Sequence, residues 1–217
     1  MANSNLITTL FLDIGAVLLS NGWGHESRQA AAKAFDLDYG EMQSRHKVLM
    51  ATFEEGKLTL SDYLDKVIFY KERPFTPEEI RAFMFAQSTP DEAMILLISQ
   101  LKEKYHLKIA VINNEARELN DYRIDKFQLN LFVDFFISSC FVHIRKPDAD
   151  IFRLALDIAH VLPENALFID DTQMFVDIAR KMGIRSITHL DYNSTLVELA
   201  SCGLFCGVKK DCNHENR

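Results

Sequence analysis

The sequence contains no apolar run long enough to span a membrane, and its N-terminus lacks a basic segment followed by an apolar stretch and a cleavage site. We therefore expect a cytoplasmic protein without a membrane partner. Basic residues are in the minority, because 24 Lys and Arg stand against 31 Asp and Glu for a net charge of -7. This deficit argues against a general nucleic-acid-binding protein. It does not exclude a phosphorylated ligand, because a local pocket can be positive in an acidic protein.

Cysteine is scarce, with four residues, and repeats and low-complexity segments are absent. Cys202, Cys206 and Cys212 lie near His214, but no two of them form the Cys-x-x-Cys pair of most structural zinc sites. We therefore predict reduced thiols and no zinc. The length of 217 residues suits one core domain with a smaller inserted unit.

Five short runs rich in Ile, Val, Leu and Phe have the character of buried strands, and helical segments separate most of them. This alternation predicts an α/β fold with a parallel sheet. The predicted strands are Leu6–Leu12, Lys108–Ile112, Phe135–Ser138, Ala166–Ile169 and Arg185–Leu190.

About 95 residues separate the first two predicted strands, far more than one crossover helix requires. The sequence favours a helical insert over residues 19–88, a core of residues 1–18 and 89–207, and a flexible tail over 208–217. Thr76-Pro77-Glu78-Glu79 is a capping box that begins one helix of the insert, and Thr89-Pro90-Asp91-Glu92 repeats this signal before the helix Asp91–Lys104. The other helices expected in the insert are His25–Phe35, Met42–Phe53 and Ser61–Tyr70, the last with Ser61 as its N-cap.

Polar residues follow the predicted strands at four places. Each has an ordinary explanation when taken alone, because Asp and Asn are common in turns and Lys is mostly solvated. Two adjacent acids at the end of a buried strand are less usual, because like charges repel there unless a cation compensates, and their oxygen atoms suit Mg²⁺. In chain order the four places are Asp13, Asn113 with Asn114, Lys146, and Asp170 with Asp171.

This ordered set resembles the haloacid dehalogenase superfamily over nearly the whole chain. The resemblance includes the insert, which is similar to the family's helical cap of the first type. The first motif, Asp13-Ile14-Gly15, is similar to the Asp-x-Gly motif of members that include sugar-phosphate phosphatases. The resemblance implies a Rossmann-like parallel sheet with an inserted cap domain.

The resemblance also implies roles for individual residues. Asp13 corresponds to the nucleophile that forms an aspartyl-phosphate. Asp13, the Gly15 carbonyl and Asp171 correspond to the groups that hold Mg²⁺, with Asp170 acting through water. Lys146 corresponds to the lysine that offsets negative charge on nucleophile and phosphate. The phosphate-binding positions are Asn113, Asn114 and Lys146.

The insert supplies candidate substrate contacts. Trp23, His25, Glu26 and Arg28 follow its first hinge, and Arg45 and His46 lie on its second predicted helix. We select Trp23, His25, Glu26 and Arg45 as candidate contacts.

Three positions depart from the family's pattern. Gly15 stands where the family has its general acid and base, Asn113 where it has a Ser or Thr that binds phosphate, and Phe175 where it has an Asp or Asn that supports the metal. Loss of a general acid typically costs about 10²–10⁴-fold in rate. His25 and Glu26 are the residues that we would test first as substitutes.

The resemblance implies a Mg²⁺-dependent phosphatase that acts on a small phosphorylated metabolite, such as a sugar phosphate. Two alternatives stay open. The departures favour a catalytically impaired binding or regulatory protein with the same fold. A 2-haloacid dehalogenase, in which the same Asp attacks carbon without a metal, is less favoured because of the Asp170-Asp171 pair.

Overall fold

The computed structural model describes residues 6–206, and the expected tail, Cys212 and His214 lie outside this range. Five strands form one sheet in the order β3-β2-β1-β4-β5, and all neighbouring pairs are parallel. The predicted parallel α/β fold is confirmed. The strands are β1 (Thr9–Leu12), β2 (Lys108–Asn113), β3 (Phe135–Ser138), β4 (Ala166–Asp170) and β5 (Arg185–Thr188).

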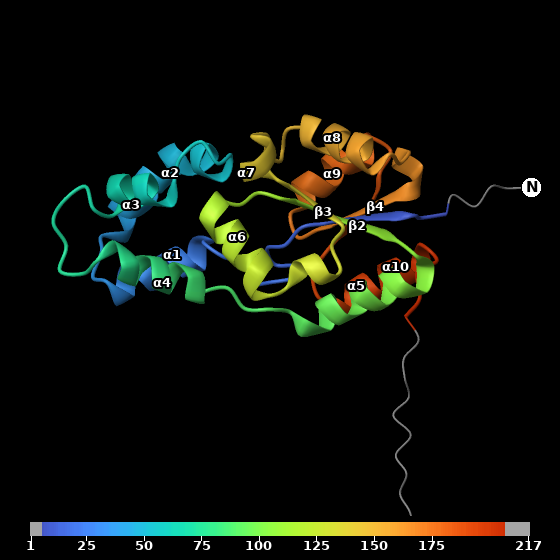
Figure 1. Cartoon of the computed structure of the whole chain (residues 1–217), viewed down its shortest axis with the longest axis horizontal. Helices are drawn as coiled ribbons and strands as arrows, with labels where there is room; N and C mark the ends of the chain where they lie inside the picture. The colour runs from blue at the N-terminus through green and yellow to red at the C-terminus, as the bar shows by residue number, and fades with distance from the viewer. Residues whose placement is uncertain (1–5, 207–217) are drawn as a thin grey trace, which may run out of the picture.

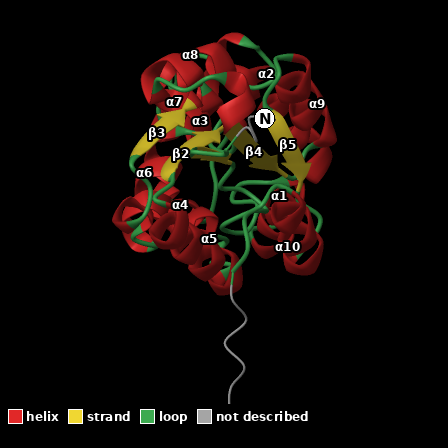
Figure 2. Ribbon diagram, turned by 90° about the vertical axis from the view of Figure 1, so that its right-hand side faces the viewer, coloured by secondary structure: helices red, strands yellow, loops and turns green. Residues whose placement is uncertain are grey.

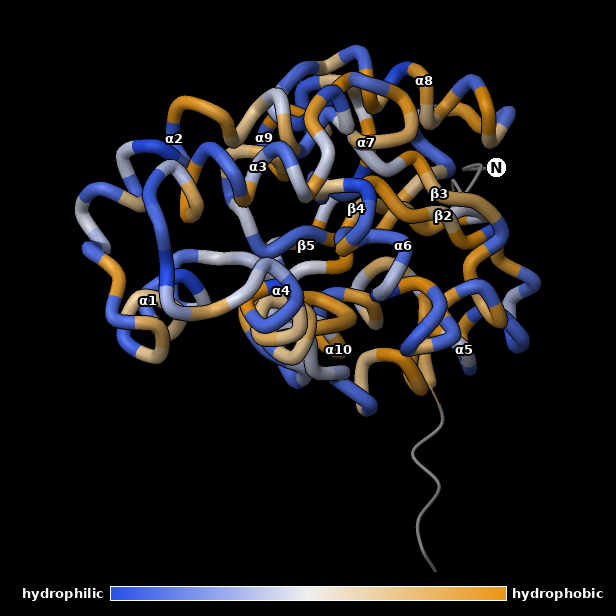
Figure 3. Tube along the Cα trace, turned by 60° about the vertical axis from the view of Figure 1, so that its left-hand side comes forward, coloured by the Kyte–Doolittle hydropathy of each residue, from blue (hydrophilic) through white to orange (hydrophobic). Residues whose placement is uncertain are grey.

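Side chains alternate between the two faces of the sheet, and each face has its own apolar cluster. Leu10 and Leu12 of β1 point to the face covered by α5 (Glu92–Tyr105) and α10 (Tyr192–Ser201). Phe11, between them, points to the face covered by α8 (Asp150–Ala159) and α9 (Gln173–Lys181). Figure 2 shows the resulting three layers. Burial on both faces explains the apolar runs of the central strands β1, β2 and β4, whereas the edge strand β5 is largely hydrophilic (Figure 3).

Four helices lie between β1 and α5 in the sequence and together form one end of the molecule (Figure 1). They pack around a separate apolar cluster that includes Trp23, Tyr63 and Met84. Helix α6 (Arg117–Lys126) lies between this group and the sheet, and Leu119 joins the cluster. The four helices are α1 (His25–Ala34), α2 (Tyr39–Glu54), α3 (Leu60–Val67) and α4 (Pro77–Ala86).

The N-caps differ in part from those that the sequence suggests. The capping box of Thr76 and Glu79 is present, as predicted. Ser61 is not the N-cap of α3, because Thr59 accepts a hydrogen bond from the Asp62 amide and the helix begins at Leu60. Likewise Asp91, and not Thr89, caps α5.

Two chain segments connect the helical group to the sheet layers, and they lie side by side. The Ser20 amide donates to the Thr89 carbonyl at 2.8 Å, and the Ser20 hydroxyl accepts from the Thr89 amide at 2.9 Å. Smaller elements complete the fold: α7 (Ser139–Val142), η1 (Leu129–Leu131) and η2 (Pro163–Asn165).

No helix within residues 6–206 has both the length and the apolar character needed to cross a membrane. The cytoplasmic location stays a prediction. No disulfide joins the three cysteines in this range, Cys140, Cys202 and Cys206.

Candidate active site

The carboxyl ends of three adjacent strands bring together residues that are far apart in the sequence. Asp13 directly follows β1, Asn113 ends β2 and Asp170 ends β4. Leu12 pairs with Val111 on one side and with Ile169 on the other, so the polar residues that follow meet at one edge of the sheet. Open α/β sheets bind ligands at this edge.

Lys146 lies among the acids of this edge and is fully buried. Its ammonium group is 2.5 Å from Asp170 Oδ2 and 3.2 Å from Asp13 Oδ2. Asp171 completes the cluster, because oxygen atoms of Asp13, Asp170 and Asp171 all lie within 4.8 Å of one another. Three carboxylates thus face one ammonium group, which leaves an excess of negative charge.

The electrostatics of the cluster follow from burial and from this excess. Burial raises the pKa of Asp13 to about 7, opposed by Lys146 and assisted by Asp170 and Asp171. Burial, and then Asp170, also raise the pKa of Asp171. For Lys146 burial acts to lower the pKa, but Asp13 and Asp170 outweigh it and the pKa rises. Carboxylates that resist ionisation together are a suitable site for a divalent cation, which would favour their charged forms.

Phe175 occupies the position where the resemblance leads us to expect a metal-supporting acid or amide. Its ring centroid lies 5.1 Å from Lys146 Nζ, and the ring of Phe168 lies 5.6 Å from the same atom. Phe175 therefore packs against the lysine and offers no oxygen ligand. Thr172 provides polar support instead, because its amide donates to Asp170 and its hydroxyl donates to Asp171.

Asn113 is buried and lines the cavity above the acids. Its Nδ2 donates to Asn120 Oδ1 at 2.9 Å, and its Oδ1 has no partner among the described residues. Asn120 Oδ1 also accepts from the Ser138 hydroxyl at 3.2 Å, so this hydrogen-bond group holds the Asn113 side chain at the end of β2.

Asn114 holds the Lys146 loop. Its Nδ2 donates to the Lys146 carbonyl at 2.8 Å, and its Oδ1 accepts from the Lys146 amide at 2.9 Å. The side chain therefore positions the lysine. One N–H of its Nδ2 is not used in these two bonds, so the role of Asn114 in phosphate binding stays a prediction.

A cavity of about 270 Å³ lies above the carboxyl edge, with walls from the sheet layers and from the helical group. It is lined by the predicted residues Asp13, Gly15, Asn113, Asn114, Lys146 and Asp171. Of the candidate contacts of the insert, Trp23 and His25 line it. Glu26 and Arg45 do not. Arg45 turns away to pair with Glu41 at 3.2 Å and to stack on Tyr70.

Several residues of the cavity wall were not selected from the sequence. Arg123 pairs with Glu115 at 2.5 Å and also donates to the Ser20 carbonyl at the connection to the helical group. Arg145, beside Lys146, pairs with Glu54 of α2 at 2.7 Å. Glu115 has a sequence signal, because it follows β2 by two residues, but Arg123 and Glu54 lie on helices and have none.

Asn21 lies close to Gly15, the position where the family has its general acid. A Cβ added to Gly15 would lie 3.0 Å from Asn21 Oδ1. Gly15 is not among the residues with positive φ, whereas Ala16 has φ 52°. The close approach of Asn21 therefore accounts for a glycine at this position, and a left-handed backbone does not.

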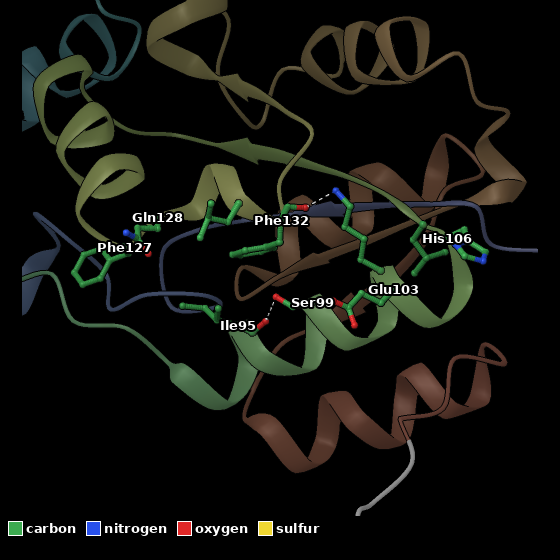
Figure 4. Close-up of a pocket in the computed structure, with 10 residues that line it drawn as sticks. Ile95, Ser99, Glu103, His106, Phe127, Gln128 and Phe132 are labelled. Atoms are coloured by element: carbon green, nitrogen blue, oxygen red, sulfur yellow. Dashed lines mark hydrogen bonds between the residues drawn. The ribbon is translucent and has the colours of Figure 1, made fainter.

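A second cavity, of about 710 Å³, lies beside α5 and η1, and none of the three acids lines it (Figure 4). Its walls include Ile95, Phe127 and Phe132, and Glu103 is the one carboxylate among its lining residues within the described part of the chain. Lys102 in its wall pairs with Asp134 at 2.6 Å and the Ser99 hydroxyl donates to the Ile95 carbonyl, so its size alone does not make it an active site.

The family model for haloacid dehalogenase-like hydrolases matches residues 4–183. The chain therefore belongs to this family of hydrolases, as its motifs and fold indicate.

Two curated relatives share part of the sequence. Bifunctional epoxide hydrolase 2 of Rattus norvegicus is 30% identical over 128 residues, which are 58% of this chain and 23% of that protein. The protein of the same name from Sus scrofa is 36% identical over 66 residues, 30% of this chain and 12% of that one. The chain thus matches less than a quarter of the length of these relatives.

Solved structures share the fold. A haloacid dehalogenase family enzyme of Bacteroides thetaiotaomicron, in complex with magnesium and inorganic phosphate, has a TM-score of 0.67 at 19% identity, over 84% of this chain and 93% of that chain. L-2-haloacid dehalogenase of Xanthobacter autotrophicus, with chloropropionic acid covalently bound, has a TM-score of 0.61 at 15% identity, over 93% of this chain and 85% of that chain.

Proposed function

We propose that this protein is a Mg²⁺-dependent phosphatase that hydrolyses a small phosphorylated metabolite through an aspartyl-phosphate on Asp13. The observation that carries the proposal is the cluster of Asp13, Asp170 and Asp171 around Lys146, with its uncompensated negative charge. The Bacteroides enzyme, which binds magnesium and phosphate on the same fold, supports it.

The residues present fit the metal. Asp13 and Asp171 offer carboxylate oxygens, the ligands that Mg²⁺ prefers, and the Gly15 carbonyl is the third protein group in our assignment. Asp170 is engaged by Lys146 and by the Thr172 amide, which suits an indirect role. When bound, Mg²⁺ would supply positive charge to the phosphate and to the nucleophile.

In the proposed reaction, an oxygen of Asp13 forms a bond to phosphorus as the bond from phosphorus to the ester oxygen breaks. The leaving oxygen departs with the electron pair. Water then attacks the aspartyl-phosphate, which releases inorganic phosphate and regenerates the Asp13 carboxylate. Such a covalent intermediate divides one difficult displacement into two easier steps.

Other residues hold the reacting groups. Lys146 offsets charge on Asp13 and on the phosphate, and Asn114 fixes the backbone of Lys146. Asn113 borders the same cavity, and its amide is the proposed donor to a phosphate oxygen. We propose that residues 19–88 act as the cap that excludes bulk water and selects the substrate, since their helices supply one wall of the cavity.

The test is turnover of an aryl phosphate such as 4-nitrophenyl phosphate with and without Mg²⁺. The wild type should turn over only with Mg²⁺, and Asp13→Asn should retain less than about 1% of this rate, because losing a covalent nucleophile removes the pathway. Asp157→Asn, at an exposed carboxylate on α8, is the matched control and should behave as the wild type. Activity of Asp13→Asn comparable to that of the wild type would contradict the proposal.

The same assay distinguishes the alternatives. Absence of turnover in a folded protein that binds Mg²⁺ would favour the impaired binding protein, as Gly15, Asn113 and Phe175 suggest. Release of halide from 2-chloropropionate without a metal would favour the dehalogenase, for which the fold of the Xanthobacter enzyme is the supporting observation.

A further inference from the structure

Arg28 is exceptional among the cations of the cavity. Four Lys and Arg side chains line it, and three of them have carboxylate partners: Lys146 with Asp13 and Asp170, Arg123 with Glu115, and Arg145 with Glu54. Arg28 pairs with no carboxylate in the described part of the chain, although it is only 7% exposed. A buried charge without a partner is costly, which indicates that a ligand completes the pair.

The contacts of Arg28 fix its guanidinium group and leave one side open. Nη1 donates to the Trp23 carbonyl, and Nε donates to Gln43 Oε1 at 2.9 Å. Nη2 donates to no residue between 6 and 206. Burial lowers the pKa of Arg28 and the Glu54 carboxylate acts, less strongly, to raise it, but Arg145 binds this carboxylate. Both acceptors of Arg28 are neutral, so its positive charge stays available to the cavity.

His46 presents a neutral donor to the same cavity. Trp23 Nε1 donates to the Tyr63 hydroxyl at 2.9 Å, and that hydroxyl lies 2.8 Å from His46 Nδ1. The buried phenol proton has no other acceptor among the described residues, so Tyr63 donates to Nδ1. Burial and the nearby Arg28 lower the pKa of His46 to about 4, which keeps the ring neutral. The ring proton therefore resides on Nε2, which makes no hydrogen bond to residues 6–206.

We infer that Arg28 and His46 form a binding site for a carboxylate group of the substrate, on the wall of the cavity that α1 and α2 supply. This inference rests on the proposed function and specifies its substrate class as a phosphate ester whose leaving group carries a carboxylate. The phosphate itself has its own partners at the sheet edge, around Lys146. A guanidinium N–H and an imidazole N–H match two acceptor oxygens of a carboxylate.

Two aryl phosphates test the site because they have similar shapes and differ in charge at the far end. The carboxylate makes its phenol the slightly poorer leaving group, so a preference for this ester cannot come from the leaving group. 4-Carboxyphenyl phosphate carries the carboxylate, and 4-carbamoylphenyl phosphate carries a neutral amide of similar shape. We expect the wild type to prefer the carboxylate by about tenfold or more in kcat/KM, since charge-assisted hydrogen bonds are the stronger ones. Arg28→Met should remove this preference through the KM of the carboxylate substrate, with the amide substrate as the internal control for folding. Arg81→Met, at an exposed arginine on α4, should keep the preference.

Binding of the leaving groups alone separates this inference from the phosphatase proposal. In calorimetry, 4-hydroxybenzoate should bind the wild type more tightly than 4-hydroxybenzamide, and Arg28→Lys should retain part of that difference because it keeps the charge. Equal affinity for the two, or equal kcat/KM for the two esters, would overturn the carboxylate site while aryl phosphatase activity stands. If neither ester is hydrolysed but the benzoate is preferred, the phosphatase proposal fails and the anion site remains.

Discussion

The side chain of Asn21 crowds the space that a side chain at position 15 of the first motif would occupy. The Oδ1 of Asn21 lies 3.0 Å from the position of a Gly15 Cβ, so a side chain at position 15 requires the end of the Asn21 side chain to shift by a few tenths of an ångström. Without an acid there, the first motif cannot protonate a departing alkoxide. A leaving group that tolerates negative charge needs less of this help.

Leaving-group preference follows from this absence. The wild type should favour aryl phosphates over alkyl phosphates, and its rate should fall as the leaving-group pKa rises. The variant Gly15→Asp combined with Asn21→Ala restores an acid and removes the contact, and it should raise alkyl phosphate turnover by about tenfold or more, a part of the 10²–10⁴-fold typical of general acids. Rates across a series of matched alkyl and aryl phosphates measure the effect.

The control is Asn21→Ala alone, which should keep the steep dependence on leaving-group pKa. A wild type indifferent to leaving-group pKa would contradict this account and indicate a substitute acid. His25 is then the first residue to mutate, since it lines the cavity and Glu26 does not.

At the start of helix α3, Thr59 is the N-cap, whereas Ser61 is a residue of the same chemical type that caps nothing. Thr59 Oγ1 accepts from the Asp62 amide at 3.1 Å and donates to the Asp62 carboxylate at 2.6 Å. Ser61 is exposed in the first turn of the helix and caps nothing. The first four backbone amides of an α-helix lack a partner within the helix. The N-cap residue, whose backbone is still extended, is the one placed to satisfy one of them.

The difference is measurable as stability. Thr59→Ala should lower the free energy of unfolding by about 1 kcal/mol, the usual cost of losing an N-cap. Ser61→Ala should change it by less than about 0.5 kcal/mol, since it is a surface substitution away from any cap. Urea unfolding of both variants provides the comparison. A larger loss for Ser61→Ala than for Thr59→Ala would contradict the assignment.

The whole molecule joins two apolar clusters on the sheet with a third in the helical group, and the cavity lies where they meet. Arg123 of α6 donates to the Ser20 carbonyl in the segment that connects to the helical group, and Arg145 pairs with Glu54 in that group. The site is therefore a property of the assembled molecule, and a ligand that binds it should stabilise the fold as a whole.

Mg²⁺ should raise the melting temperature, because a ligand that binds only the folded state stabilises it by mass action. At about 100 times its Kd the gain is roughly 2.7 kcal/mol, which for a chain of this size corresponds to about 5–10 °C. Asp171→Ala should abolish the shift, and Asp157→Ala, away from the site, should keep it. Thermal unfolding with millimolar Mg²⁺ or with EDTA measures both. A shift of the same size in Asp171→Ala would show that the metal binds elsewhere.

The sequence by itself determined the parallel sheet, its five strands, the helical insertion and the order Asp13, Asn113, Lys146, Asp170-Asp171. These features are local, since strand composition and the polar residues that follow a strand are written in consecutive positions. The carboxyl ends of parallel strands share one edge, so the convergence of Asp13, Asn113 and Asp170 also followed from the pattern.

Only the tertiary structure decided which helical residues face the cavity. Arg28 and His46 line it while Glu26 and Arg45 do not, because the orientation of a helix depends on what its other faces pack against. The partners of Asn114, the contact of Asn21 with Gly15 and the relay from Trp23 through Tyr63 to His46 join distant positions. Such contacts form only when separate elements pack together, so they cannot be predicted from the local sequence around each residue.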